Sequence, residues 1–397
     1  MNILITGLTL HNNKGGPALA LSLIHQLKKY FENAKFFMAV SDSNDNMAIE
    51  KIWARMYGID GIIGALRIKE AFPPFFFLPM NFQKNKKFLK FLNGIHLIVD
   101  LTALSYMDLS HLSFKNNMVK NIANYINRYY ANKKKIKMIR WTQSYGPFNS
   151  PFTKFISKQD LKYQRTIFVR GEKSFQYIKE LFPNKEVYSF PDIAITLPSK
   201  TEYINKIKLG KKYLTISPSS VLYKIQKEKH IFEISKLINY LLTKYKYEVI
   251  LLPHNLMTTL TPSLTNCDLK VCEEINNHLK NKVKIIQDDL DVYNLKGVIS
   301  KAYLHIGARY HSIVAALSAA IPCISFSWHN KYKDIMNMYE VGEYVYEGEG
   351  IDRIFEMIKN LENSYLEIKK KLIKNQKRLQ SEIELNLKLF INMYNEM

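Results

Sequence analysis

Cysteine is scarce in this sequence, and its three thiols form no recognisable pattern. Cys267, Cys272 and Cys323 lack the paired spacing of a disulfide framework, and no zinc-spaced histidines accompany them. No apolar run reaches the roughly 18 residues that a membrane-spanning helix needs, and residues 1–7 lack the features of a signal peptide. These absences predict a protein of the reducing cytoplasm with no metal site.

Acidic residues are scarce relative to basic ones. The chain of 397 residues has 57 Lys and Arg against 35 Asp and Glu, which gives a formal net charge of +22. Such a charge indicates an anionic partner: nucleic acid, an anionic membrane surface or a phosphorylated small molecule. The basic residues are spread along the chain and form no recognisable nucleic-acid-binding module, so we expect no nucleic-acid partner. Background composition is the alternative explanation of the lysine excess.

Short apolar segments alternate with amphipathic ones along most of the chain. Strands are expected at 3–8, 35–40, 95–101, 137–143, 165–170, 186–195, 213–217, 248–252, 283–286, 304–307 and 323–326. Helices between them predict an α/β fold of doubly wound parallel sheets. The length favours two Rossmann-like domains, 1–200 and 201–345, facing across a cleft. A helical segment, 346–397, is expected to pack back on the first domain.

Ligands of open parallel sheets bind beyond the carboxyl ends of the strands, so the loops there are the candidates. The first such loop contains Gly15 and Gly16, which allow close approach of the backbone to a ligand at a helix N-terminus. The Gly-x-Gly-x-x-Gly and Walker motifs are both absent. An anion-binding loop is predicted, and a plain glycine turn is the alternative.

Two more loops follow strands in the first half. The segment 143–148 is polar and then turn-forming, and an ordinary surface loop is the alternative interpretation. Arg170 lies at a strand end directly before a helix, where a guanidinium can bind a carboxylate or phosphate. A structural ion pair with a nearby acid is the alternative for Arg170.

The most informative stretch runs from residue 305 to residue 331. Arg309 and His311 fall at the turn between a strand and a helix, where both can face one anionic ligand. The imidazole can also transfer protons near neutral pH. The helix that follows, 313–320, is apolar and therefore expected to be buried. A functional pair is predicted, and a structural histidine is the alternative.

Lesser candidates follow other strands. His254 comes after the strand 248–252, and the segment 327–331 comes after the strand at 323–326; both could line a cleft or be solvated. The acidic run 288–291 suggests a metal site, but Asp291 fits a helix N-cap better.

An aromatic, proline-broken segment, 71–79, precedes a basic stretch that contains Lys84, Lys86, Lys87 and Lys90. Such a segment could contact an anionic membrane surface. Packing on the core is the slightly favoured alternative.

In their order, these loops resemble the polysaccharide pyruvyl transferase family. The resemblance extends over roughly residues 10–335 and is carried by Asn13-Lys14-Gly15-Gly16, Gln143-Ser144-Tyr145-Gly146-Pro147-Phe148, Arg170-Gly171-Glu172-Lys173-Ser174, Pro191-Asp192-Ile193-Ala194, Ile299-Ser300, Arg309-Tyr310-His311-Ser312, Pro322 and Lys331. The chain departs from the family at Gly171, where an acid usually follows the arginine; here Glu172 comes one place later.

The resemblance implies a GT-B-like fold and the transfer of a pyruvyl group from phosphoenolpyruvate to two hydroxyls of a sugar. It implies that Arg309 and His311 are catalytic and that they line the phosphoenolpyruvate site with Arg170. The other predicted substrate-binding residues are Asn13, Lys14, Gly15, Gly16, Gln143, Ser144, Tyr145, His254, Tyr310, Ser312 and Lys331. The acceptor would be a glycan or a lipid-linked or nucleotide-linked sugar, and no cofactor is required. A cytoplasmic location, with peripheral contact at the inner face of the membrane, is expected.

Two other functions compete with this one. A GT-B glycosyltransferase would need an acid to hold the ribose of a nucleotide sugar; no acid is clearly placed for this, and Glu273 and Glu274 are the remaining candidates. A non-catalytic protein of the membrane surface would tolerate substitution at Arg309 and His311. Such a protein would bind lipid through the segment 72–91.

Overall fold

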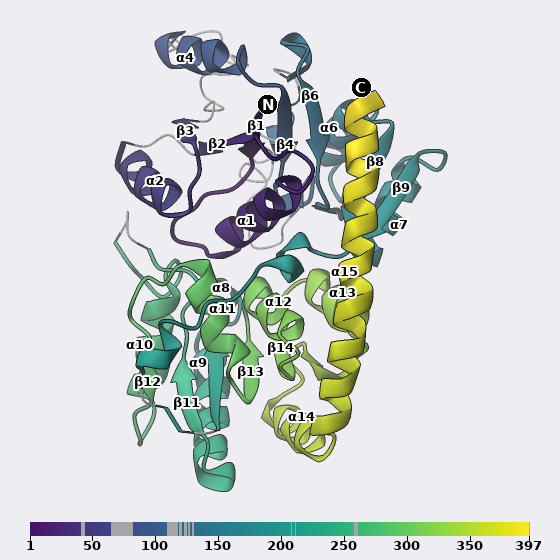
Figure 1. Cartoon of the computed structure of the whole chain (residues 1–397). Coiled ribbons are helices and arrows are strands. Elements are labelled where there is room, and N and C mark those ends of the chain that lie inside the picture. The colour runs from purple at the N-terminus through teal and green to yellow at the C-terminus, as the bar shows by residue number, and fades with distance from the viewer. Residues whose placement is uncertain are drawn as a thin grey trace. The chain divides into compact units, whose positions relative to one another are not determined.

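The computed structural model describes residues 1–40, 44–64, 82–108, 131–207, 209–210, 212–257 and 261–396, and residues 118, 121, 122, 125 and 128. The chain divides into two compact units (Figure 1). The first consists of Met1–His11, Leu19–Asp192 and Ile383–Met397, and the second of Asn12–Ala18 and Ile193–Glu382. The aromatic segment 71–79 lies outside the described residues.

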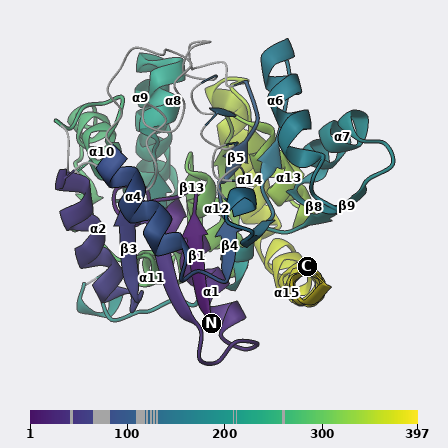
Figure 2. The ribbon, with the colours of Figure 1, turned by 90° about the horizontal axis from the view of Figure 1, so that it is seen from above.

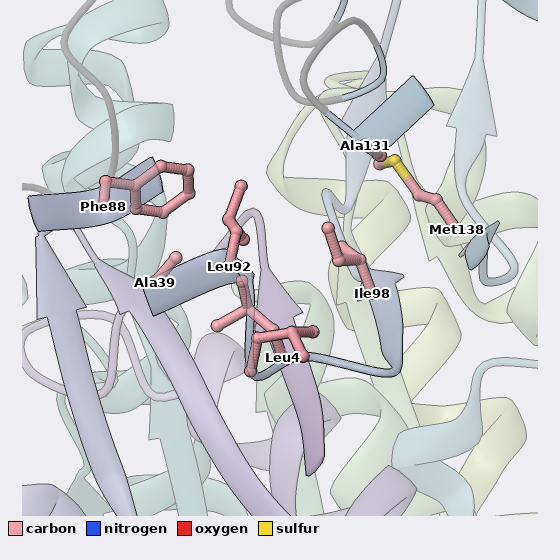
Figure 3. Packing of buried hydrophobic residues seen from close by; sticks show 8 residues of the cluster. Leu4, Ala39, Phe88, Leu92, Ile98, Ala131 and Met138 are labelled. Carbon is pink, nitrogen blue, oxygen red and sulfur yellow. The ribbon is translucent and has the colours of Figure 1, made fainter. Parts of the chain in front are cut away.

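The first unit is built on a parallel sheet in the order β3-β2-β1-β4-β6. Its strands are β1 (Asn2–Thr6), β2 (Lys35–Val40), β3 (Gly61–Gly64), β4 (Leu97–Asp100) and β6 (Lys137–Arg140). Successive side chains of a strand point to opposite faces, and four consecutive buried residues of β1, Ile3 to Thr6, show that both faces are covered. One buried cluster places Phe88 and Leu92 of α4 (Phe82–Leu92) against Leu4 and Ile98 (Figure 3).

The first unit also contains two smaller parallel sheets. Two-stranded parallel pairs join β5 (Leu104–Ser105) to β7 (Ser144–Tyr145), and β8 (Thr166–Arg170) to β9 (Glu186–Phe190). Gln143 also pairs with Val169 through an isolated parallel bridge. Figure 2 shows β8, β9 and the helices α6 (Pro151–Leu161) and α7 (Glu172–Leu181) grouped together. Helix α2 (Asn44–Met56) connects β2 to β3.

The second unit contains a six-stranded parallel sheet in the order β12-β11-β10-β13-β14-β15. The strand order reverses between β10 and β13, which is where such sheets bind ligands. The strands are β10 (Tyr213–Ser217), β11 (Glu248–Leu251), β12 (Lys284–Ile285), β13 (Leu304–Gly307), β14 (Cys323–Phe326) and β15 (Val345–Tyr346).

The helices of the second unit alternate with these strands. They are α8 (Ser220–Gln226), α9 (Glu228–Tyr240), α10 (Asp268–Asn277), α11 (Val292–Ser300), α12 (Tyr310–Ser318), α13 (Asn330–Met338) and α14 (Ile351–Asn363). A π-helical turn, Leu241–Tyr245, extends α9, and short 3-10 helices occupy Ile193–Thr196, Ile204–Lys206 and Gly342–Tyr344. The predicted class, two doubly wound α/β domains with parallel sheets, is confirmed.

Two long helices contribute residues to both units: α1 (Gly15–Leu27) and α15 (Tyr365–Glu396). Within the first unit, the last turns of α15 place Phe390 against Trp141, with 4.7 Å between the ring centres.

None of the described helices is both long and apolar enough to cross a membrane. The three cysteines are buried free thiols.

Candidate functional site

The glycine loop before α1 is bound to the loop after β11 by its backbone. Asn13 and Asn255 form an antiparallel bridge, and the Lys14 amide donates to the His254 carbonyl at 3.0 Å. The Leu256 amide donates to the carbonyl of Asn12 at 3.3 Å. This pairing attaches the loop to the carboxyl edge of the second sheet, although it lies at the other end of the sequence.

Gly15 is the point where the first turn of α1 meets the first turn of α12. Its amide donates to the Asn13 side-chain oxygen at 3.1 Å. A Cβ at Gly15 would lie 2.2 Å from Nδ1 of His311, so no other residue fits beside the imidazole in this position. The amides at the start of each helix favour an anion there, and His311 belongs to the first turn of its helix.

Arg309 is held by a buried carboxylate to which no sequence pattern points. Its Nε donates to Asp268 at 2.7 Å, and its Nη2 donates both to the second oxygen of Asp268 and to the Ser220 hydroxyl at 2.9 Å. Among the described residues no group pairs with Nη1 of Arg309, whose side chain is 12% exposed. A bidentate pair of this kind fixes the plane of the guanidinium.

The backbone at Arg309 is fixed by a buried histidine. His305 lies between the hydroxyls of Thr215 and Ser312, each 2.9 Å from a ring nitrogen. The Ser312 hydroxyl donates its single proton to the Arg309 carbonyl at 2.8 Å. It must therefore accept a hydrogen bond from Nε2 of His305, which carries the ring proton. Burial lowers the pKa of His305 to about 3, so this imidazole is neutral and structural.

His254 is buried beside the same group of residues. Burial lowers its pKa well below the ordinary value, and the positive charges of neighbours such as Arg309 lower it further. Its Nε2 is enclosed and has no hydrogen-bond partner among the described residues. A buried nitrogen that can accept or donate one more hydrogen bond is a group that a ligand or a water molecule can satisfy.

Lys14 is a buried cation whose Nζ forms an ion pair with Asp289. Burial lowers its pKa, while Asp289 and then Asp291 act in the opposite direction. Asp291 is also the predicted N-cap: its carboxylate accepts from the amides of Tyr293 at 2.8 Å and Asn294 at 3.1 Å, so this prediction is confirmed. The charge of Lys14 is therefore already partnered.

Lys331 contacts aromatic rings near the Arg309 turn. Its Nζ lies 5.2 Å from the ring centre of Tyr310, 4.7 Å from that of Trp328 and 5.5 Å from that of Tyr332. The Tyr332 hydroxyl donates to the carbonyl of Ala308 at 2.9 Å. The loops after β13 and β14 are therefore packed together, with a cation held over Tyr310.

The predicted candidates of the first unit form a cluster of their own. Nη1 of Arg170 lies 2.5 Å from the Asp192 carboxylate, its Nε donates to Ser144 at 3.1 Å, and its Nη2 donates to the Ala103 carbonyl at 2.8 Å. The Arg170 amide donates to the Gln143 carbonyl at 2.9 Å. Only 4% of Arg170 is exposed, so its guanidinium has the structural ion pair that the sequence left open. Tyr145 is buried in a nearby hydrophobic cluster.

A buried His–Glu pair, with its histidine in the loop after β1, is another feature that sequence patterns missed. The Glu50 carboxylate is 2.5 Å from Nδ1 of His11 and accepts from the Leu10 amide. No motif connects His11 to Glu50 in the sequence, because the pair forms only when α2 packs on the sheet. Asp268 is a similar case: in the sequence it is an ordinary acid at the start of a helix, and only the fold brings Arg309 into contact with it.

The second unit thus brings together most of the predicted residues: Asn13, Lys14, Gly15, Gly16, His254, Arg309, Tyr310, His311, Ser312 and Lys331. Two helix starts and one guanidinium nitrogen can bind an anion, and two imidazoles can bind or move protons. Within the described ranges, no group of three or more His, Cys, Asp or Glu is placed to hold a metal ion.

Solved structures similar to this chain share its GT-B-like fold. UDP-GlcNAc 2-epimerase from Neisseria meningitidis bound to UDP-GlcNAc has a TM-score of 0.57 and 13% identity, covering 97% of this chain and 100% of that chain. Anabaena HepE in complex with UDP has a TM-score of 0.59 and 11% identity, covering 100% of both chains. The spinosyn rhamnosyltransferase SpnG, complexed with thymidine diphosphate, has a TM-score of 0.55 and 10% identity, covering 96% of both. Identities this low show the fold alone.

Family membership comes from the sequence model. No curated protein matches the chain in sequence. The model of the polysaccharide pyruvyl transferase family matches residues 13–330, a span that begins in the glycine loop and ends beside Lys331. That match covers most of the chain and includes all the residues named above for the second unit except Lys331, which directly follows it. The chain therefore belongs to the polysaccharide pyruvyl transferase family and is a transferase.

Proposed function

We propose that the protein transfers a pyruvyl group from phosphoenolpyruvate to a sugar of a cell-surface polysaccharide or its precursor, and that the donor binds in the second unit. The observation that carries this proposal is the turn at Arg309 and His311, packed against Gly15 and beside His254. In the first unit, the predicted substrate-binding residues remain Gln143, Ser144, Tyr145 and Arg170.

Phosphoenolpyruvate matches the chemistry of this turn because it carries a phosphate and a carboxylate. Nη1 of Arg309 can bind one of these anionic groups, and the amides at the starts of α1 and α12 can bind the other. Both cations, Lys14 and Arg309, already have carboxylate partners, Asp289 and Asp268. Donor binding would therefore depend on directed hydrogen bonds more than on net positive charge.

The transfer can be written with balanced atoms. The methylene carbon of phosphoenolpyruvate gains a proton, and the central carbon bonds to the oxygen of one sugar hydroxyl, which loses its proton. The second hydroxyl then bonds to the same carbon, and phosphate leaves with the electrons of its carbon–oxygen bond. Of the two hydroxyl protons, one balances the proton gained by the methyl group and the other leaves on phosphate. We assign His311 as the acid or base of one of these steps.

A nucleotide-sugar donor is the competing proposal for a GT-B-like fold. It needs an acid for the ribose, and the two acids considered for that task already have partners close by in sequence. Glu273 lies 2.7 Å from Lys270, and Glu274 lies 3.5 Å from His278. No observation in the described residues favours this donor over phosphoenolpyruvate.

A thermal-shift comparison of donors tests the proposal. Phosphoenolpyruvate is expected to raise the melting temperature of the wild-type protein, and UDP, UDP-GlcNAc and thymidine diphosphate are not. Arg309→Ala is expected to abolish the shift because it removes the guanidinium, whereas Arg353→Ala is expected to keep it. Arg353 is a matched control because it forms an ion pair with Glu356 on the surface of α14. Stabilisation by a nucleotide alone would overturn the proposal.

A further inference from the structure

Asp268 connects the loops that follow three neighbouring strands. Its carboxylate accepts from the Ser220 amide after β10 at 2.9 Å and from the His254 amide after β11 at 3.3 Å. It also accepts two hydrogen bonds from Arg309 after β13. These strands are adjacent in the sheet, in the order β11-β10-β13. One side chain therefore connects the loops at the point where the strand order reverses.

The carboxylate of Asp268 is completely buried, and it is the acid that Arg309 faces. Free arginine side chains populate many rotamers, and a bidentate partner selects one of them. Since Nε and Nη2 are both occupied, Nη1 is the nitrogen that the arrangement leaves for a ligand. The same carboxylate fixes the backbone of His254, whose Nε2 is enclosed without a partner among the described residues.

We propose that Asp268 is the positioning residue of the donor site: it directs Nη1 of Arg309 toward the donor anion and holds His254 beside it. This inference rests on the proposed function for the identity of the donor. The direction of Arg309 is a property of the protein alone, and it can be tested without any ligand.

Two substitutions separate a positioning role from a general effect on folding. Asp268→Asn replaces one acceptor oxygen with an NH2 group, which faces the donors of Arg309 or His254 and breaks the bidentate pair. Ser220→Ala removes only the hydroxyl that accepts from Nη2 at 2.9 Å and leaves the carboxylate in place. Asp352→Asn is the matched control, because Asp352 is an exposed acid in the first turn of α14.

The first measurement is the Nε–H signal of Arg309 in the nitrogen NMR spectrum of arginine-labelled protein without ligand. A slowly exchanging signal is expected in the wild type, in Ser220→Ala and in Asp352→Asn, and its loss is expected in Asp268→Asn. A signal that persists in a folded Asp268→Asn protein would overturn the inference, whatever the donor is.

The second measurement is kcat/KM for phosphoenolpyruvate in a double-mutant cycle of Asp268→Asn and Arg309→Lys. Each change is expected to lower kcat/KM by about 10- to 100-fold, as losses of supporting contacts in active sites do. Ser220→Ala is expected to lower it by about two- to tenfold. In the Arg309→Lys protein, Asp268→Asn should cost far less than in the wild type, because the guanidinium is already gone and only the contact of Asp268 with the His254 amide remains to be lost.

Additive losses in this cycle would show that Asp268 does not act through Arg309, and the inference would then be wrong. Failure of the proposed function gives a different result. In that case the wild-type protein shows no turnover with phosphoenolpyruvate, while the Arg309 signal still reports whether Asp268 directs the guanidinium.

Discussion

At the scale of single residues, Gly15 carries the sharpest constraint in the site. A methyl group there would lie 2.2 Å from Nδ1 of His311, so Gly15→Ala must displace the imidazole or the start of α1. We expect Gly15→Ala to reduce transfer activity about 100-fold or more, because misplaced catalytic groups cost at least that much. Activity and melting temperature are measured together.

The control for Gly15→Ala is Gly94→Ala. A Cβ at Gly94 has ordinary contacts at 3.8 Å and beyond, so full activity is expected. If Gly15→Ala keeps wild-type kcat, the close packing of α1 on His311 has no role in the reaction.

Lys296 predicts a pH dependence of stability. It is buried, and its Nζ donates to the Leu197 carbonyl at 2.6 Å; among the described residues no carboxylate forms an ion pair with it. Burial lowers its pKa from 10.5 to about 7, so between these values the unfolded chain holds a proton that the folded protein lacks. Below pH 7 the lysine is charged in both states, and the folded protein bears the full cost of burying that charge. This cost decreases as the pH rises to 10.5, so the free energy of unfolding should rise with pH across that window.

Denaturant unfolding at several pH values checks this effect. Lys296→Met should flatten the rise between pH 7 and 10.5, whereas Lys301→Met, which changes an exposed lysine at the end of the same helix, should not. Equal pH dependence in the wild type and Lys296→Met would show that Lys296 is not the group responsible.

Individual residues were predictable from sequence where the reason is local. Asp291 as a helix cap needs only the residues after it. Arg170 shows the opposite case, because its partner Ser144 belongs to β7 and its partner Asp192 follows β9. From the sequence, a structural ion pair was one of two interpretations of Arg170, and nothing local favoured it over binding of an anionic ligand.

At the scale of elements, the last turns of α15 are an essential part of the first unit. Phe390 is fully buried against Trp141, and Ile383 and Leu387 are also buried. Phe390→Ala should lower the free energy of unfolding by about 3–5 kcal/mol, as such truncations in a core do. Leu385→Ala on the same helix should change it little, since Leu385 is 54% exposed. Chemical denaturation distinguishes them, and equal losses would contradict this packing.

Most strands of the second unit were predicted closely because each is a short apolar segment followed by a helix, whereas β15 was not predicted. The ranges 213–217, 304–307 and 323–326 agree with β10, β13 and β14. The bounds of helices α2 and α6 are hard to predict from the sequence because their apolar residues are diluted by polar ones, and exposed Ile52 and Phe155 obscure the buried face. The expected strand 186–195 ends at Phe190, followed by a 3-10 helix.

At the scale of the whole molecule, the sequence predicts the class of fold, but it does not predict that the glycine loop before α1 belongs to the second unit. Alternating strands and helices are a local pattern, whereas the placement of Asn12–Ala18 in the second unit depends on pairing with Asn255, far along the chain. Lys14 and Arg309 are both paired with acids, so these two cations add little net positive charge at the proposed donor site.

Transfer of isotope from phosphoenolpyruvate to a glycan is the most direct test of the proposed pyruvyl transfer. The protein is incubated with carbon-labelled phosphoenolpyruvate and a pool of lipid-linked and nucleotide-linked glycans, and the products are analysed by mass spectrometry. We expect labelled ketal on a glycan, release of one phosphate per transfer, and neither product with Arg309→Ala. Unlabelled glycans extended by a sugar from the nucleotide-linked pool, with phosphoenolpyruvate unconsumed, would contradict the proposal.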